Sequence, residues 1–214
     1  MNNYYTKYPR TYHLPWSLGY TEDDNVLTDA SHFKRERVVV TIKMDGENTS
    51  MYSDHIHARS LDSVGHESRN WVKAFHAERC HDIPKGWRIC GENMYATHSI
   101  HYTNLLSYFY GFSVWNGPLC KSWDETLEWF QLLNIVPVPL LYRGMFDKRT
   151  IDSLFYEYCV ANDETEGYVI RTERSFLSED FPYFVAKYVR KNHVNTSTHW
   201  MHEKIVPNEL AILK

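Results

Sequence analysis

The sequence is poor in cysteine and glycine, and it lacks the short motifs that mark several common protein classes. Its 214 residues include four cysteines and nine glycines, and no Cys-x-x-Cys pair occurs. Neither a zinc ribbon nor a dithiol redox centre is therefore indicated. Twelve histidines are present, but the close pairs His55–His57 and His98–His101 have no carboxylate in a known ligand pattern. Because Gly-x-Gly-x-x-Gly and Gly-x-x-x-x-Gly-Lys-Ser/Thr are also missing, a dinucleotide-binding fold and a P-loop lose their main support.

Signals for secretion and for membrane insertion are missing as well. Residues 1–10 are polar and tyrosine-rich, unlike a signal peptide, and no apolar run approaches the length that spans a bilayer. The four cysteines are widely spaced, at Cys80, Cys90, Cys120 and Cys159. Reduced thiols in a cytoplasmic protein that does not contact a membrane are the simplest interpretation.

The charge balance is mildly acidic, with 23 Lys and Arg against 27 Asp and Glu and a formal net charge of −4. A protein that coats nucleic acid without specificity would be strongly basic. Any nucleic-acid binding by this chain must therefore use a local basic surface. Clusters of basic residues occur at Lys34, Arg35 and Arg37, and at Lys187, Arg190 and Lys191.

The hydrophobic pattern predicts one α+β domain over residues 1–214, within which residues 1–36 form a polar N-terminal segment. The β-branched run at residues 38–42 is typical of a buried strand, and Asp45-Gly46 then indicates a turn. Ser122 and Glu125 form a capping-box pattern that predicts a helix start. Further helices are expected at 67–79 and 150–161, and further strands at 49–52, 55–59, 87–90, 106–115, 168–171 and 183–189. Strands and helices do not alternate regularly, which favours largely antiparallel sheets over a doubly wound parallel sheet.

The segment Lys43-Met44-Asp45-Gly46-Glu47-Asn48 carries the first chemical signal. A lysine at the end of an apolar strand, before a tight turn, places an amine at the mouth of a pocket. A deprotonated amine can attack phosphorus, so the ordinary lysine pKa of about 10.4 must fall. Burial and a nearby positive charge, including that of a metal ion, both lower this pKa. By itself, Lys-x-Asp-Gly also fits a hairpin with a solvated lysine.

Five further segments follow Lys43 in order. They are Ala58-Arg59-Ser60, Arg88-Ile89-Cys90-Gly91-Glu92, Tyr108-Phe109-Tyr110-Gly111-Phe112-Ser113-Val114, Glu166-Gly167-Tyr168-Val169-Ile170-Arg171 and Val185-Ala186-Lys187-Tyr188-Val189-Arg190. Together, the series resembles motifs I, Ia, III, IIIa, IV and V of the covalent nucleotidyltransferases, which comprise DNA ligases, RNA ligases and mRNA capping enzymes. Asn48 and the tail at residues 187–194 are most similar to bacteriophage RNA ligase 2, the RNA-editing ligases of kinetoplastids and small RNA-ligase-family proteins.

The resemblance implies an ATP-dependent RNA ligase that joins 3′-OH and 5′-phosphate ends through a lysine–AMP intermediate and an adenylylated 5′ end. The implied fold has two antiparallel sheets packed face to face, with flanking helices and the nucleotide between the sheets. RNA ends, or DNA ends, are the implied polynucleotide partners. An end-processing partner protein is compatible with this activity, and the sequence gives no oligomeric state.

The same resemblance implies a role for each matching residue. Lys43 would attack the α-phosphorus of ATP, and Lys187 would contact the α-phosphate. Glu166 and Glu92 would hold Mg²⁺, or Mn²⁺, directly or through water. The adenine ring would stack on Phe112, with Phe109 or Tyr110 as alternatives. The remaining nucleotide contacts would come from Thr41, Ile42, Asn48, Arg59 and Arg190.

The sequence departs from the pattern of the family at two points. Many ligases have Lys-x-Lys in motif V, but Val189 stands in the place of the second lysine, and either Arg190 or Lys191 is a candidate to replace it. Only 24 residues follow Arg190, which leaves no room for a C-terminal OB-fold domain. We therefore expect polynucleotide contacts from Arg190, Lys191 and His193, and from Lys34, Arg35 and Arg37. A minimal DNA ligase and a catalytically reduced nucleotide- or RNA-binding module are the alternative interpretations, and a capping guanylyltransferase fits the tail less well.

Overall fold

The β-branched run at residues 38–42 forms the middle of strand β2 (Arg37–Lys43), in which Val38, Val39 and Val40 are fully buried. The structure, a computed structural model, describes residues 5–62, 65–162, 165–191 and 205–212. Strand β2 belongs to a first sheet, here sheet A. Its strand order is β1 (Tyr12–His13), β12 (Val185–Val189), β10 (Gly167–Thr172), β2 and β9 (Leu140–Met145). All of these pairs are antiparallel except β1 with β12.

A second sheet, here sheet B, begins directly after the turn at Asp45-Gly46. A Cβ atom on Gly46 would lie 2.6 Å from the carbonyl oxygen of Asn93. The close approach of these two backbone segments therefore requires glycine at this turn. The strand order of sheet B is β11 (Phe176–Leu177), β7 (Leu119–Cys120), β6 (Phe109–Asn116), β5 (Trp87–Asn93), β3 (Glu47–Met51) and β4 (Ile56–Ala58). A short strand, β8 (Val136–Pro137), pairs in parallel with β6.

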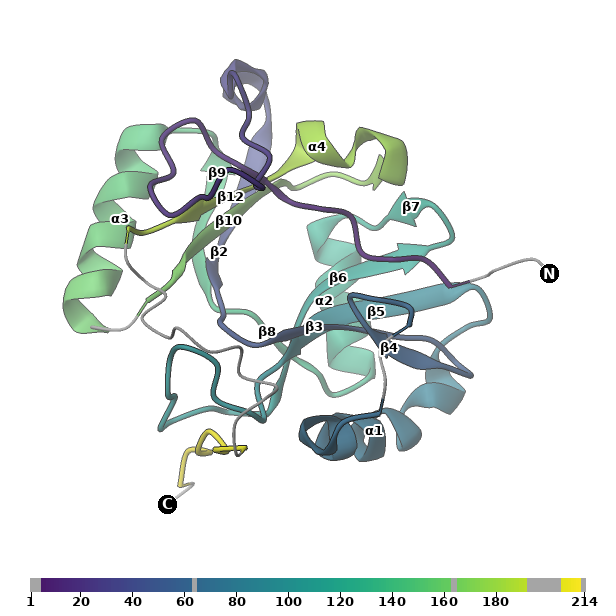
Figure 1. Cartoon of the computed structure of the whole chain (residues 1–214). Coiled ribbons are helices and arrows are strands. Elements are labelled where there is room, and N and C mark those ends of the chain that lie inside the picture. Colours follow the sequence, from purple (N-terminus) through teal and green to yellow (C-terminus); the bar gives the residue numbers. More distant parts are fainter. Residues whose placement is uncertain (1–4, 63–64, 163–164, 192–204, 213–214) are drawn as a thin grey trace.

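Helices lie outside the two sheets (Figure 1). Helix α3 (Lys148–Ala161) runs along the outer side of sheet A, and helix α2 (Trp123–Leu132) lies beside β6. The predicted capping box of α2 is present, because the Ser122 hydroxyl and the Glu125 carboxylate each cap the other's backbone. The other two α-helices of the described residues are α1 (Asn70–Ala77) and the short α4 (Phe181–Phe184). The α+β class with two sheets is therefore confirmed, and none of the described helices is long and apolar enough to cross a membrane.

Three differences between the structure and the sequence-based expectation concern sheet A and its connections. Residues 183–184 belong to α4 rather than to a strand, because Pro182 fits the first turn of a helix and lacks the N–H that a central strand needs. Strand β9 was not expected, and it forms by antiparallel pairing with β2. The N-terminal segment is more than a polar appendage, because it places Leu14 and Phe33 in the core, both fully buried, and adds β1 to sheet A.

The segment at residues 205–212 is fixed to the body by one buried side chain. Asn208 is 1% exposed, and its amide nitrogen donates to the carbonyl oxygen of Met94 at 2.7 Å. Its amide oxygen accepts from the backbone N–H of Tyr102 at 2.8 Å. The loop at residues 94–105 is thereby held in place. That loop in turn supports the turn after Lys43, because the backbone N–H groups of Ser99 and Ile100 donate to the Asp45 carboxylate at 2.8 and 2.9 Å.

Replacing Asn208 with alanine is expected to lower the free energy of unfolding by about 2–4 kcal/mol, because buried backbone groups lose their partners. Urea unfolding followed by tryptophan fluorescence would measure the change. Asn104→Ala is the matched control, since Asn104 is exposed on the same loop. If the two variants are equally stable, Asn208 does not anchor the segment.

Candidate active site

A cavity of about 270 Å³ lies between sheet A and sheet B. Strands of both sheets, helix α2 and the N-terminal segment contribute to its lining. Eight of the residues singled out from the sequence line this cavity: Thr41, Ile42, Lys43, Asn48, Arg59, Glu92, Phe112 and Lys187. Residues from six separate segments of the chain are thus brought to one place.

The centre of the site is an ion pair between Lys43 and Glu166. Lys43 ends β2, and Glu166 immediately precedes β10, whose Gly167 is the register partner of Lys43. This antiparallel register places the Lys43 Nζ atom 2.6 Å from a Glu166 carboxylate oxygen. The Lys43 side chain is 26% exposed and lines the cavity, whereas that of Glu166 is 7% exposed and is not among the lining residues.

The pKa of Lys43 is raised in this structure, which corrects the expectation that it is lowered. Burial acts to lower this pKa, but the carboxylates of Glu166, Glu92 and Asp45 outweigh burial because each favours the charged amine. The amine is therefore protonated while Glu166 remains its partner. Chemistry at Lys43 requires that the influence of these carboxylates be removed.

Glu92 lies on β5 opposite Asn48 of β3, and both side chains face the cavity. Burial, together with the negative charges of Glu166 and Asp45, raises the pKa of Glu92 to about 8, although Lys43 opposes this shift. The buried Oδ1 atom of Asn48 has no hydrogen-bond partner among the described residues. Two carboxylates and an amide oxygen without a partner are a suitable set of hard ligands for a divalent cation.

This oxygen set is smaller than a complete metal cage. In the described part of the chain, no group of three or more His, Cys, Asp or Glu residues is arranged so that it could hold a metal ion. Mg²⁺ is commonly held by one or two carboxylates, with water and substrate phosphates completing the shell. Glu92 and Glu166 therefore fit a metal that is bound together with a phosphorylated ligand.

Lys187 faces Lys43 from β12, and its Nζ atom lies 3.6 Å from the carboxylate of Asp24. The pKa of Lys187 is lowered by burial and then by the positive charge of Lys43, while Asp24 acts in the opposite direction. Asp24 also lies 3.4 Å from the Nε2 atom of the buried His13. Asp24 was not predicted from the sequence, because nothing in its local pattern connects it with residues more than 160 positions later.

Buried residues form the inner end of the cavity, and Phe112 forms part of its wall. Phe109 and Tyr110, the alternatives to Phe112, are buried elsewhere and do not line the cavity. Trp123 and Arg171 are 2% and 6% exposed and do line it. Their Nε1 and Nη1 atoms have no hydrogen-bond partner within the described residues, although the Arg171 side chain also interacts with the Cys120 thiol. Buried donors without partners are costly, so a ligand with acceptor atoms fits this end.

The backbone of Thr41 and Ile42 is less available than expected. The N–H of Ile42 donates to the carbonyl oxygen of Pro139 at 2.9 Å, because a bulge between Val40 and Thr41 shifts the pairing of β2 with β9. Thr41 and Ile42 do line the cavity. The N–H of Ile42 can contact a ligand only if this bond to Pro139 is shared or broken.

Arg190 does not line the central cavity. Side chains alternate along a strand, so Lys187 faces the cavity while Tyr188 faces α3, and Arg190, just beyond the end of β12, follows Tyr188. Arg190 instead lines a second cavity, together with Trp16, Lys148 and Tyr188. It therefore does not contact a nucleotide placed beside Lys43 in this structure. Lys191 is exposed, and His193 lies outside the described residues.

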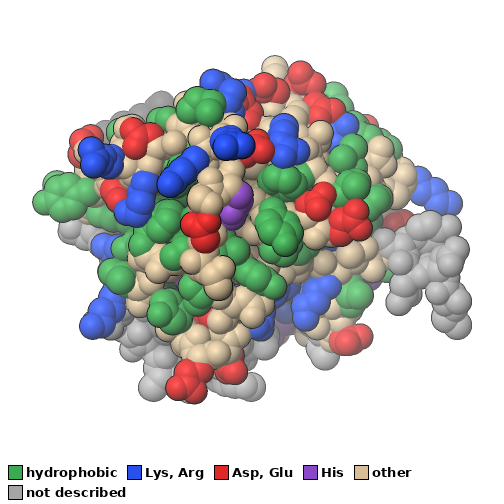
Figure 2. Space-filling model, turned by 90° about the horizontal axis from the view of Figure 1, so that it is seen from above, with side chains coloured by type: hydrophobic (Ala, Val, Ile, Leu, Met, Phe, Trp, Pro, Cys, Tyr) green, Lys and Arg blue, Asp and Glu red, His purple; other side chains and the backbone are tan. Residues whose placement is uncertain are grey.

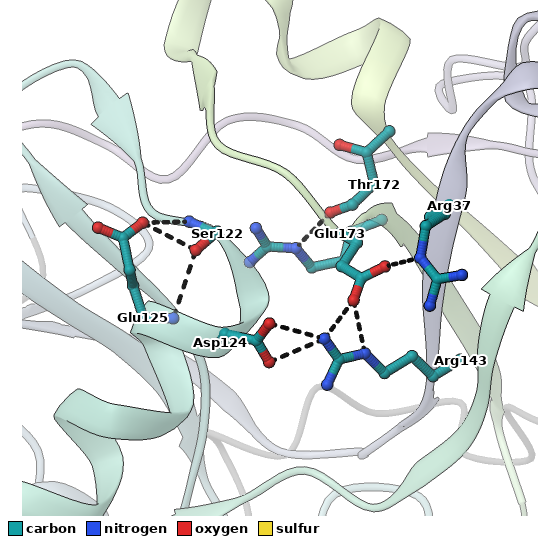
Figure 3. Close-up of polar contacts among 8 residues, drawn as sticks. Arg37, Ser122, Asp124, Glu125, Arg143, Thr172 and Glu173 are labelled. Carbon is teal, nitrogen blue, oxygen red and sulfur yellow. Dashed lines mark hydrogen bonds and ion pairs between the residues drawn. The ribbon is translucent and has the colours of Figure 1, made fainter.

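The basic cluster of Lys34, Arg35 and Arg37 is partly neutralised by acidic side chains. Arg37 donates to Glu173 at 2.6 Å, and Arg143 joins Glu173 to Asp124 (Figure 3). Figure 2 shows that basic and acidic side chains are interspersed with hydrophobic ones over the face seen from above. On this face, no broad surface of one charge is available for a polynucleotide.

A family model described as RNA ligase matches residues 36–189, so this chain belongs to the RNA ligase family. Among curated proteins, none matches the sequence. A mutant of the Naegleria gruberi RNA ligase, solved with ATP and Mn, is 14% identical and superposes with a TM-score of 0.54 over 89% of this chain. An archaeal ATP-dependent RNA ligase is 15% identical, with a TM-score of 0.55 over 86% of the chain.

These two likenesses establish a fold shared with these RNA ligases. The present chain spans 57% of the Naegleria protein and 48% of the archaeal one. The family match begins at residue 36, so the segment before it, which contributes to the cavity, lies outside the matched region.

Proposed function

We propose that this protein is an ATP-dependent RNA ligase in which Lys43 becomes covalently linked to AMP. The observation that supports this most directly is the position of Lys43, which lines a cavity together with Glu92, Lys187, Arg59 and Phe112 and pairs with Glu166 at 2.6 Å. A module that only binds nucleotide has no need of an amine held in this way. The implied ligands are ATP and a divalent cation.

In the proposed reaction, the Nζ atom of Lys43 attacks the α-phosphorus of ATP. A nitrogen–phosphorus bond forms, the bond to the β-phosphate oxygen breaks, and pyrophosphate leaves with the electron pair. Lys187 is placed to stabilise the negative charge that develops on the α-phosphate oxygens. Phe112 offers an aromatic face for the base, and Arg59 offers a guanidinium for the ribose or the phosphates.

The proton on Lys43 must leave before this attack. If Glu166 and Glu92 turn to hold a cation, the carboxylates that raise the pKa of Lys43 are neutralised. Burial and the neighbouring Lys187 then act together to lower that pKa. A divalent cation held there would also supply positive charge to the reacting phosphate. Cation binding and activation of Lys43 are thus coupled through Glu166.

The subsequent steps would transfer AMP to a 5′-phosphate and join that end to a 3′-OH. Incubation with α-labelled ATP, followed by nicked RNA and nicked DNA duplexes, tests this proposal. Sealing of RNA with release of AMP is expected. Sealing of DNA alone would favour a DNA ligase, and the lack of any adduct would exclude a ligase.

Because the similar solved RNA ligases are described with ATP, we expect the labelling reaction to prefer ATP over GTP by about tenfold or more, which corresponds to the roughly 1–3 kcal/mol cost of one buried polar group left unpaired. Competition between the labelled nucleotides measures the preference. Trp123→Phe keeps an aromatic ring but removes the Nε1 donor, so it should reduce the preference for ATP over GTP. Trp129→Phe is the control on the same helix, since Trp129 does not line the cavity. Preferential transfer of GMP would instead indicate a capping enzyme.

A further inference from the structure

The N-terminal segment forms a strap, defined here as residues 5–13, that runs from sheet B to sheet A (Figure 1). On sheet B, the backbone N–H of Thr6 donates to the Tyr52 hydroxyl at 2.9 Å, and Arg88 donates to the Thr6 carbonyl oxygen at 2.5 Å. On sheet A, Tyr12 and His13 pair with β12. Between these anchors, residues 8–11 line the cavity.

Arg10 is the one basic residue of the strap that lines the cavity. Its side chain is exposed, and its Nη1 atom donates to the carbonyl oxygen of Asp23 at 2.8 Å. This contact orients the guanidinium and uses only one of its N–H donors. The strap is thus fixed at both ends, with a cation held between them.

A second guanidinium, that of Arg59, lines the same cavity. Burial lowers the pKa of Arg59, and the positive charge of Arg10 lowers it further, so the two cations lie close enough to repel each other. Asp24 is the nearby acid and partly offsets this repulsion, but its carboxylate lies beside Lys187 and His13. Two guanidiniums held together in this way are suited to an anion with several oxygen atoms.

The cation that many ligases carry at the second motif V position cannot come from β12 in this chain. Val189 stands in that place and is 2% exposed. A Cβ atom on Gly19 would lie 2.8 Å from the Val189 side chain, so Gly19 covers it closely. Arg190 lies beyond Val189 in the second cavity. A phosphate-binding cation must therefore come from another segment, and the strap that pairs with β12 supplies Arg10.

We propose that Arg10, together with Arg59, binds the β- and γ-phosphates of ATP and stabilises the pyrophosphate that leaves when Lys43 is adenylylated. This inference rests on the proposed function. When the bond to the β-phosphate oxygen breaks, negative charge develops on that oxygen, and the Arg10 guanidinium donates to the departing phosphates. Pyrophosphate departs before the polynucleotide reacts, so Arg10 acts only while lysine–AMP is formed.

The first test is binding, which needs no turnover. In a Lys43→Ala background, Arg10→Ala should weaken the binding of ATP by about tenfold or more and leave the binding of AMP unchanged within about twofold, because AMP lacks the phosphates in question. Isothermal titration with each nucleotide measures both affinities. Lys7→Ala is the matched control, since Lys7 is exposed on the same strap and does not line the cavity. Arg10→Lys should recover part of the loss, because it retains the charge.

The second test separates the chemical steps. Arg10→Ala should slow formation of lysine–AMP by about tenfold or more, while sealing of pre-adenylylated RNA stays within about twofold of the unmodified protein. Equal weakening of ATP and AMP, or equal slowing of both steps, would show that Arg10 supports the fold or the polynucleotide, and would overturn the inference. Unchanged ATP binding and adenylylation in Arg10→Ala would also overturn the inference. If the Lys43→Ala protein binds neither nucleotide while it remains folded, the proposed function itself is wrong.

Discussion

Replacing Lys43 with alanine is expected to abolish formation of the covalent AMP adduct, which the unmodified protein should form once per chain with ATP and Mg²⁺. The adduct should be labile in acid and stable in alkali, as a phosphoramidate is. Lys43→Arg should be equally inactive, because a guanidinium stays protonated and cannot act as a nucleophile. Labelling with α-labelled ATP, followed by gel analysis and mass spectrometry of the modified peptide, measures both results.

The control for this experiment is Lys73→Ala, which removes an exposed lysine on α1, away from the cavity. This variant should label as the unmodified protein does. Labelling of Lys43→Ala to the same extent would show that another residue is the nucleophile. Loss of labelling accompanied by loss of the folded state would require the comparison with Lys43→Arg, which retains the charge beside Glu166.

Replacing Glu166 with glutamine has two opposite consequences, and their balance identifies the role of this carboxylate. The change removes the largest charge that raises the pKa of Lys43, which by itself would make the amine more reactive at neutral pH. It also removes a proposed ligand for the divalent cation. We expect the loss of the metal ligand to dominate. Adenylylation should then fall by about 10²-fold or more, the scale seen when a charge-stabilising group is lost.

A rate that rises in Glu166→Gln would mean that Glu166 serves mainly to hold Lys43 protonated. A Mg²⁺ titration distinguishes the two roles further, because loss of a metal ligand moves the half-saturating concentration upward. Glu173→Gln is the control. It also breaks ion pairs, with Arg37 and Arg143, but at a place outside the cavity (Figure 3). Adenylylation by this control should be unchanged once its stability has been taken into account.

Local patterns predicted the elements whose cause is local. The β-branched run became β2, the Ser122–Glu125 pattern became the cap of α2, and the helix expected from residue 150 begins at Lys148, after the Asp147 cap. Most of the motif residues, which were recognised by their order, line one cavity because antiparallel register aligns strand ends, although Glu166 and Arg190 are not among the lining residues. Lys43 and Gly167 are opposite each other for this reason.

Features that depend on pairing between distant segments could not be predicted. Strand β1 has two residues and no apolar pattern, and it exists because β12 provides a partner. The place of Arg190 followed from side-chain alternation beyond β12, which the motif alone does not reveal. The raised pKa of Lys43 depends on how closely three carboxylates approach the amine, and spacing along the chain carries no such information.

The pairing of the strap with β12 also has a consequence for biosynthesis. Residues 12–13 emerge from the ribosome early, but their partners are residues 186–187. At roughly 5–20 residues per second, the strap therefore waits on the order of ten seconds for the strand on which it folds. During that time the strap has no partner strand in sheet A and cannot connect the two sheets. If Arg10 binds the triphosphate as proposed, a nascent chain cannot complete this contact until synthesis has passed residue 189.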